Sequence, residues 1–159
     1  KERDFPKAIE AYKNYLGGMK SDPDISDLFL YGRLNYYAAT DSAYQDKQPT
    51  YLAEADTIFA QVAVKVPDNY LGNFWRARVN SLRDPETTQG LAKPYYEAAL
   101  SILEQKPDAT KSVLVECNSY LGYYYFVKED YNQSKQYWNK ILEIDPENET
   151  ATKALGGIK

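Results

Sequence analysis

The chain has 159 residues, with 19 lysines and arginines against 23 acidic residues, no histidine and a single cysteine. The missing histidine excludes Ser-His-Asp and Cys-His nucleophiles, and Cys117 alone excludes intrachain disulfides and cysteine-rich metal sites. A net charge of −4 argues against nucleic-acid binding, and every apolar run is far shorter than the roughly 20 residues that span a bilayer. We therefore expect a non-enzymatic chain with no catalytic residues, no metal, no cofactor, no nucleic-acid partner and no membrane insertion of this segment.

Helices are predicted wherever a small residue is followed by apolar residues at i+4, i+7 and i+8, which places all of them on one helical face. The first such helix covers residues 5–19. The four sets are Ala8/Tyr12/Tyr15/Leu16, Ala55/Phe59/Val62/Ala63, Ala92/Tyr96/Ala99/Leu100 and Ser134/Trp138/Ile141/Leu142. A proline followed by an acid lies after each set and predicts the helix end, because proline cannot continue a helix. These stops are Pro23-Asp24, Pro67-Asp68, Pro107-Asp108 and Pro146-Glu147.

Three further helices precede the last three of these, around the stretches 29–35, 74–80 and 119–125. Each stretch carries a small residue at the same phase: Gly32, Ala77 and Gly122. Because glycine costs about 1 kcal/mol relative to alanine inside a helix, a recurring small residue predicts a close helix crossing.

The predicted fold is all-α, an antiparallel αα-hairpin solenoid of about three and a half repeats with a C-terminal helix. We expect one domain over residues 1–159, divided into a half repeat 1–24, repeats 25–68, 69–110 and 112–148, and a terminal helix 148–157. Since the array opens on a lone second helix, we expect a fragment of a longer repeat protein, with self-association through the uncapped N-terminal end as one possibility. The alternative is a natural terminus with a capping helix.

The third repeat resembles a tetratricopeptide repeat (TPR) over the 34-residue frame Val115 to Asn148. The residues that carry the resemblance are Leu121-Gly122, Tyr125, Asp130-Tyr131, Ser134, Trp138 and Pro146. Asn118 departs from the family at its first large aromatic position, and Ser134 departs where the family has alanine. The stretch Asp84 to Glu97, which contains the lengthened loop of the second repeat, looks like the longer-looped repeats of bacterial envelope TPR proteins. This resemblance favours the periplasm or cell envelope over the cytoplasm.

Two asparagines, Asn35 and Asn80, stand where the third repeat has Tyr125. We predict that their amides hydrogen-bond the backbone of the inserted loops, residues 41–50 and 84–90; the alternative is that they tolerate exposure near a helix end. Pro94 must lie in a first helical turn, so its helix is expected to begin near residues 89–91.

The TPR resemblance implies that a peptide or partner protein binds in a concave groove lined by the first helix of each repeat. The groove positions are Phe29, Arg33, Tyr36, Tyr37, Phe74, Arg78, Ser119, Tyr123 and Phe126. Arg33 and Arg78 occupy the same phase one repeat apart and could share a partner carboxylate, or they could pair with acids on neighbouring helices and hold the array together. Phe29 and Trp75 stand where polar residues of the chaperone-tail clamp are expected, which disfavours that class of partner.

Sixteen tyrosines are the compositional oddity of the chain. Five of them fall at core positions of the repeat frame: Tyr12, Tyr15, Tyr96, Tyr125 and Tyr131. Tyr36, Tyr37 and Tyr123 fall on the expected groove face instead. Because aromatic rings also stack on sugars, a glycan- or small-ligand-binding module is the alternative function.

Overall fold

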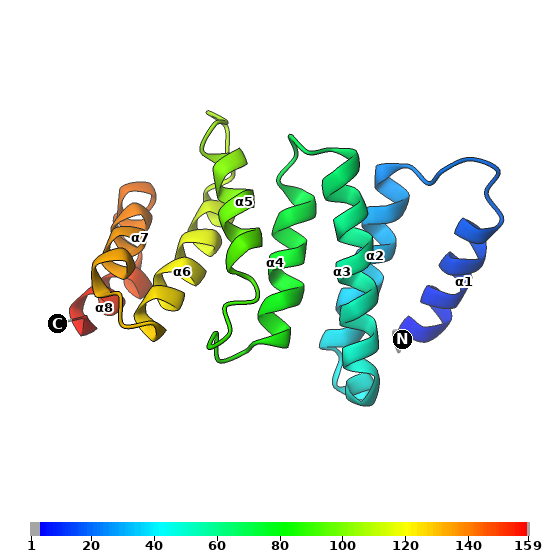
Figure 1. Cartoon of the computed structure of the whole chain (residues 1–159), viewed down its shortest axis with the longest axis horizontal. Coiled ribbons are helices and arrows are strands. Elements are labelled where there is room, and N and C mark those ends of the chain that lie inside the picture. Colours follow the sequence, from blue (N-terminus) through cyan, green and yellow to red (C-terminus); the bar gives the residue numbers. More distant parts are fainter. Residues whose placement is uncertain (1–3, 159) are drawn as a thin grey trace. The chain divides into compact units, whose positions relative to one another are not determined.

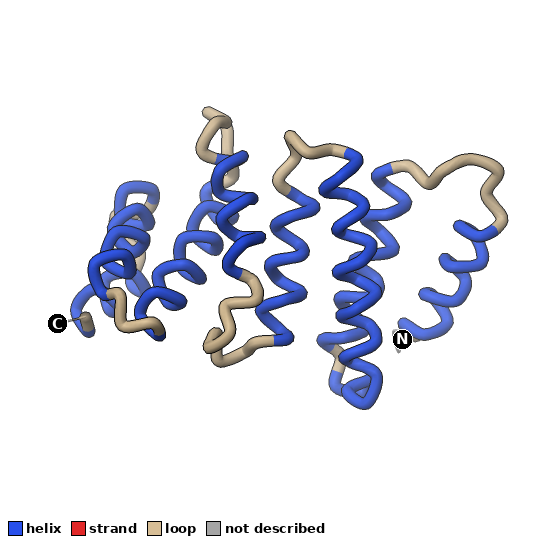
Figure 2. The backbone as a smooth tube through the Cα atoms, in the orientation of Figure 1, coloured by secondary structure: helices blue, strands red, loops and turns tan. Residues whose placement is uncertain are grey.

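The computed structural model describes residues 4–158, and all regular elements in that range are helices (Figure 1, Figure 2). The all-α prediction is therefore confirmed. The chain divides into two compact units, Lys1–Arg83 and Asp84–Lys159. This division falls inside the expected repeat 69–110, so the repeat boundaries stay a prediction.

Over residues 4–83, the first unit contains four α-helices and one short 3-10 helix. Its elements are α1 (Phe5–Gly17), α2 (Ile25–Thr40), η1 (Ser42–Lys47), α3 (Gln48–Lys65) and α4 (Leu71–Arg83). Each α-helix packs against the next one along the chain, and α2, α3 and α4 lie side by side (Figure 1). This is the neighbour-to-neighbour packing of a helical solenoid.

The second unit contains four α-helices that pack in the same consecutive manner. Its elements are α5 (Lys93–Leu103), α6 (Lys111–Val127), α7 (Tyr131–Ile144) and α8 (Glu149–Gly157). The last helix matches the expected 148–157 closely. A hydrophobic core in this second unit contains Trp138, Ile141, Ala151 and Ile158. Within residues 4–158, no helix combines the length and the apolar character needed to cross a bilayer.

Aspartates that align in the repeat frame begin two of the helices in the same way. The Asp4 carboxylate accepts a hydrogen bond from the Lys7 backbone N–H at 3.0 Å, and the Asp130 carboxylate accepts one from Gln133 at 3.1 Å. Both residues have nearly the same backbone angles. A side-chain oxygen at this position satisfies one of the free N–H groups of the first turn, so the two helices share one sequence-encoded start.

The predicted close crossings are confirmed at both glycines. A Cβ atom on Gly32 would lie 2.7 Å from the Phe59 ring, and one on Gly122 would lie 2.7 Å from the Trp138 ring. The Ser134 hydroxyl donates to the Gly122 carbonyl at 2.7 Å across the second crossing. Serine at this position therefore adds a hydrogen bond between α6 and α7 that alanine could not make.

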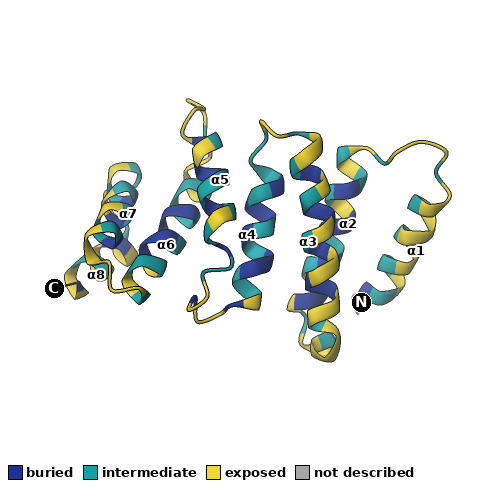
Figure 3. Ribbon diagram, viewed as in Figure 1, coloured by how far each residue is buried: buried dark blue, intermediate teal, exposed yellow. Residues whose placement is uncertain are grey.

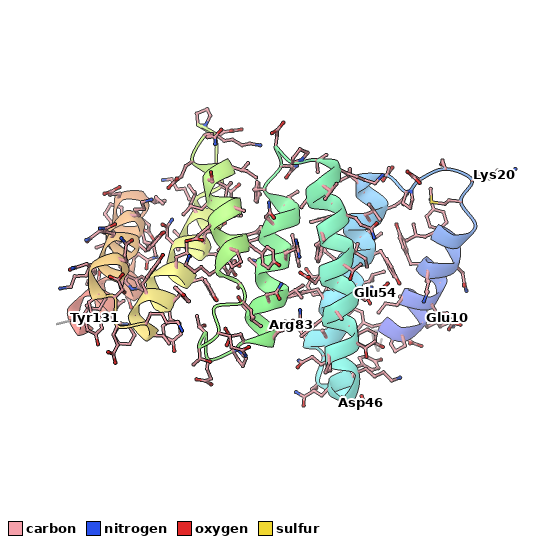
Figure 4. The ribbon with its side chains drawn as sticks, in the orientation of Figure 1. Glu10, Lys20, Asp46, Glu54, Arg83 and Tyr131 are labelled. Carbon is pink, nitrogen blue, oxygen red and sulfur yellow. The ribbon has the colours of Figure 1, made fainter. Side chains whose placement is uncertain are left out.

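Three tyrosines link one helix to the next by donating to a carboxylate. Tyr12 donates to Asp27 at 3.0 Å, Tyr31 donates to Glu54 at 3.3 Å, and Tyr96 donates to Glu116 at 3.1 Å. Glu54 projects from α3 (Figure 4). Burial and then the hydrogen bond to Asp27 raise the pKa of Tyr12 to about 12. Part of the tyrosine surplus is thus used in contacts between consecutive helices.

The core prediction holds for some tyrosines and fails for others. Tyr96 is buried, and Tyr12 and Tyr125 are half-buried. Buried and exposed residues occur on the same helices along the chain (Figure 3). Tyr131 lies at the start of α7 (Figure 4). Tyr15 is 53% exposed and Tyr131 is 40% exposed, so their assignment to the core was wrong. Tyr131 lies in the first turn of α7, where its ring packs on Phe126 at the surface.

The prediction that Asn35 and Asn80 bind the inserted loops was wrong. Asn35 donates to the Tyr31 carbonyl in its own helix, and Asn80 donates to the Arg76 carbonyl and to the Asp56 carboxylate. Both side chains are buried, so the alternative of tolerated exposure fails as well.

The loop after α4 is organised by the buried carboxylate of Asp84. It accepts hydrogen bonds from the backbone N–H groups of Gln89, Gly90 and Leu91, with the shortest, from Gly90, at 2.7 Å. These bonds hold residues 84–91 outside the helix, which is why α5 begins at Lys93 rather than near residues 89–91. The other inserted segment, 41–50, is not an open loop, because it forms η1 and the first residues of α3.

We expect Asp84→Asn to lower the free energy of unfolding by about 1–3 kcal/mol near pH 7, because three backbone donors lose a charged acceptor. Burial would raise the pKa of Asp84, but the backbone N–H groups outweigh it and hold that pKa below its ordinary value of 3.8. The carboxylate therefore stabilises the fold above about pH 4, and this contribution is lost as the pH falls through the lowered pKa. Urea titrations across this pH range should show the difference between wild type and variant closing in acid. The exposed Glu86→Gln in the same loop is the control, and an equal effect there would contradict the assignment.

Candidate functional site

Trp75 on α4 is the centre of an aromatic cluster in the first unit. Its indole stacks on Phe59 with ring centroids 5.5 Å apart, and it receives the edges of Phe29, Tyr36 and Tyr37 at 5.8, 5.2 and 6.2 Å. Trp75 itself is 7% exposed. Such edge-to-face contacts fix the rings that surround the indole in place.

Arg33 on α2 lies among three of these rings. Its guanidinium carbon is 5.8 Å from the Phe29 centroid, 5.4 Å from that of Tyr37 and 5.6 Å from that of Trp75. One terminal nitrogen donates to the Tyr37 hydroxyl at 3.1 Å, while the buried Nε has no hydrogen-bond partner among the described residues. A guanidinium held on aromatic faces keeps its N–H edge directed away from the rings, where an acceptor can meet it.

Arg78 lies about one turn after Trp75 on α4, and its guanidinium contacts the same indole. Its guanidinium carbon is 4.5 Å from the Phe74 centroid and 5.0 Å from that of Trp75. Two guanidinium groups thus lie within 6 Å of one ring. We call the set Phe29, Arg33, Tyr36, Tyr37, Trp75 and Arg78 the aromatic–arginine surface.

The structure brings together the six expected groove residues of the first unit, although not in equal exposure. Tyr37 is exposed, whereas Phe29, Arg33, Tyr36 and Arg78 are half-buried. Phe74 is buried, so its contribution is the ring beneath Arg78. The alternative that both arginines pair with neighbouring acids fails for Arg33, which has no acidic partner within residues 4–158.

The ion pair between α3 and α4 is made by Arg76, which sequence reasoning passed over. Its Nε and terminal nitrogen contact the two Asp56 oxygens at 3.1 and 3.2 Å, and Asn80 donates to the same carboxylate at 2.9 Å. The two charged side chains are about one-fifth exposed. This fork-to-fork pair fixes the helix that carries Trp75 and Arg78. Its signal was in the sequence, since Asp56 and Arg76 lie on the two helices that flank the Pro67 turn.

Two of the three expected groove residues of the second unit line a cavity of about 230 Å³ between α6, α7 and α8. Tyr123 and Phe126, which are 43% and 42% exposed, line it together with Trp138 and Ile158. Lys153 is its one charged lining residue among those described. Ser119 lies one turn before Tyr123 on α6 and does not line the cavity.

The arrangement offers no metal site within the described part of the chain, since no group of three or more cysteine or acidic side chains converges there. Cys117 is buried, as expected for a packing residue.

The chain matches no protein-family model, and no curated protein sequence matches it. Among solved structures it is similar to the C-terminal part of a TPR repeat-containing protein from Cytophaga hutchinsonii. The two share 33% sequence identity with a TM-score of 0.82. The similarity covers 96% of this chain and 54% of the other, so this chain spans about half the length of its neighbour.

Proposed function

This chain is a tetratricopeptide-repeat protein, and from that premise we propose that it is a non-enzymatic scaffold that binds a segment of a partner protein. The binding element is the aromatic–arginine surface, and the recognised group is a carboxylate. The observation that carries the proposal is the sharing of one indole by Arg33 and Arg78.

Three features of the surface support carboxylate recognition. Stacking on the rings holds both guanidinium groups in place before a partner arrives, which lowers the entropy lost on binding. The buried Nε of Arg33 lacks an acceptor, and a carboxylate oxygen would supply one. Tyr37 adds exposed aromatic area next to Arg33, a residue type that is enriched at protein interfaces.

The glycan alternative has less support. A sugar needs polar groups around the rings on which it stacks, and the cavity at Tyr123 and Phe126 has Lys153 as its one charged lining residue among those described. Besides Lys153, the hydrogen-bonding groups of the lining are the Tyr123 hydroxyl and the Trp138 indole N–H. This cavity is better suited to an apolar side chain of a partner.

The test selects peptides on the full chain from a phage-displayed random library and measures the enriched peptide by fluorescence anisotropy. We expect a carboxylate in that peptide whose amide replacement weakens binding by about tenfold or more. We expect Arg33→Ala plus Arg78→Ala to weaken binding to the same extent and to abolish the difference between acid and amide peptides.

The matched control removes the same charge elsewhere in the first unit. Lys47→Ala plus Lys65→Ala changes two exposed cations and should leave affinity nearly unchanged near physiological salt. Carboxylate-dependent binding that survives the double arginine variant would refute the proposed site. If the lysine control loses as much affinity as the double arginine variant, the effect of the arginines would be one of net charge and not of a specific site.

A further inference from the structure

A second cavity of the second unit, of about 450 Å³, lies between α5, α6 and α7 and includes no residue of the surfaces described above. Its apolar lining comes from Leu100 and Leu103 on α5, Leu114 on α6 and Ile144 on α7. Its volume falls within the range of small-ligand pockets, which is about 300–1,000 Å³.

One residue that lines this cavity is a buried polar side chain. Asn118 is 1% exposed and lines the cavity, and its amide nitrogen donates to the Leu114 carbonyl at 2.8 Å. Its Oδ1 is buried with no hydrogen-bond partner among the described residues. A buried acceptor without a donor raises the free energy of the folded state. A ligand that donates an N–H or O–H to this oxygen would remove that cost.

Comparison with the chain's other repeats shows that the asparagine is not required by the fold. Asn118 lies four residues before Gly122, and its counterpart before Gly32 is Leu28. Leu28 is buried in an apolar cluster with Tyr31, Ile58 and Val62. The counterpart in α4, Asn73, is half-buried, so α6 is the one of these three helices that buries an amide at this position.

The exposed rim of the cavity carries an excess of positive charge. Lys140 and Glu104 form an ion pair at 2.9 Å and neutralise each other. The other charged residues of the rim are two lysines, Lys106 and Lys111, and one acid, Glu143. None of these three has an ion-pair partner among the described residues. Lys111, Leu114 and Asn118 share one face of α6, with about 10 Å of helix rise between the first and the last. A lysine side chain can therefore meet an anionic group of a ligand whose donor reaches Asn118.

We propose that this cavity binds an aliphatic amino acid acylated on nitrogen, either as a free molecule or as the C-terminal residue of a peptide. The aliphatic side chain packs on Leu100, Leu103 and Ile144, the amide N–H donates to the Asn118 Oδ1, and the carboxylate faces Lys111 and Lys106. In such a ligand the side chain, the amide nitrogen and the carboxylate are all bonded to the same Cα atom, so one small molecule can meet the apolar residues, Asn118 and the lysines of this cavity together.

The first test uses wild-type protein and three small probes, followed by the chemical shifts of backbone amides in NMR titrations. N-acetyl-leucine should perturb residues around 100–118 and 140–144. Isocaproate, which lacks the N–H, and N-acetyl-leucinamide, which lacks the carboxylate, should each bind about tenfold more weakly. Equal binding of all three probes, or no binding of N-acetyl-leucine at millimolar concentration, would overturn the proposal.

The second test fills the site from within the chain. Asn118→Leu copies the residue of α2, so we expect an unchanged or higher melting temperature together with a loss of N-acetyl-leucine binding of tenfold or more. Asn139→Leu on the exposed face of α7 is the matched control and should leave binding unchanged. Unchanged affinity in Asn118→Leu would refute the site, and the probe series on wild type decides the matter if that variant does not fold.

The source of the ligand follows from comparing N-acetyl-leucine with acetyl-Gly-Gly-Leu. Tighter binding of the peptide assigns the site to a chain end, and tighter binding of the free acid assigns it to a small molecule. Either result supports the site, whereas binding of neither overturns it.

Discussion

Replacing Trp75 with alanine is expected to lower the free energy of unfolding by about 3–5 kcal/mol, the loss typical of a large aromatic residue removed from a core. The indole is nearly fully buried and contacts Phe29, Tyr36 and Phe59, so its removal leaves a cavity that the surrounding rings cannot fill without leaving their edge-to-face arrangement. Urea titration followed by far-ultraviolet circular dichroism measures the loss without relying on tryptophan emission.

Leu30→Ala is the control for Trp75→Ala, because Leu30 is an exposed apolar residue on α2 in the same unit. Its removal should change the free energy of unfolding by no more than about 0.5 kcal/mol. A loss below about 1 kcal/mol for Trp75→Ala would mean that the indole is not a packing centre. The variant should also lose binding to acidic peptides, since Arg33 and Arg78 would no longer share a ring.

Gly72→Ala is expected to lower the free energy of unfolding by about 1–3 kcal/mol, because it forces α3 and α4 apart. A Cβ atom at this position would lie 2.5 Å from the backbone nitrogen of Ala63 and 2.7 Å from its Cα. Backbone atoms cannot rotate away as the tip of a side chain can, so a helix must move. Chemical denaturation of the variant measures the cost.

Gly156→Ala is the matched control for Gly72→Ala. Gly156 is also inside a helix, and a Cβ there would meet nothing within 4 Å. Alanine should therefore be neutral or stabilise the chain by up to about 1 kcal/mol, through its higher helix propensity. If Gly72→Ala is as neutral or stabilising as Gly156→Ala, the result would contradict the close approach of α4 to the backbone of Ala63.

Most of the helices could be predicted from the sequence because their signals are local. The apolar sets that begin at Ala55 and Ser134 and the stops at Pro67 and Pro146 each lie within a few turns of the helix they define. Local signals of this kind do not depend on how the array is assembled. The glycine crossings were also predictable, since repetition at one phase revealed them.

The loops were mispredicted because contacts that do not recur from repeat to repeat organise them. The Asp84 carboxylate reaches residues five to seven positions ahead and sets the start of α5, and no pattern in the repeat frame announces this. Asn35 and Asn80 were predicted to bind loops because they lie near a helix end. In the structure, each amide donates a hydrogen bond to a carbonyl one turn earlier in its own helix. A side chain with a local acceptor does not need a distant one.

Most residues of the aromatic–arginine surface could be named from the sequence, but its central residue, Trp75, could not. The repeat frame identified Arg33 and Arg78 by their common phase, but it assigned Trp75 to the place of an absent clamp residue. Ring geometry, which a sequence does not display, makes that indole the support on which both guanidinium groups lie.

The chain contains two tryptophans, and the division after Arg83 separates them, with Trp75 in the first unit and Trp138 in the second. Each indole is buried, so its emission changes when the fold around it opens. Single-tryptophan versions made by Trp75→Phe or Trp138→Phe would each give the fluorescence of one half alone. The protein thus carries an intrinsic optical reporter in each half, with which the cooperativity between the two halves can be measured without any added label.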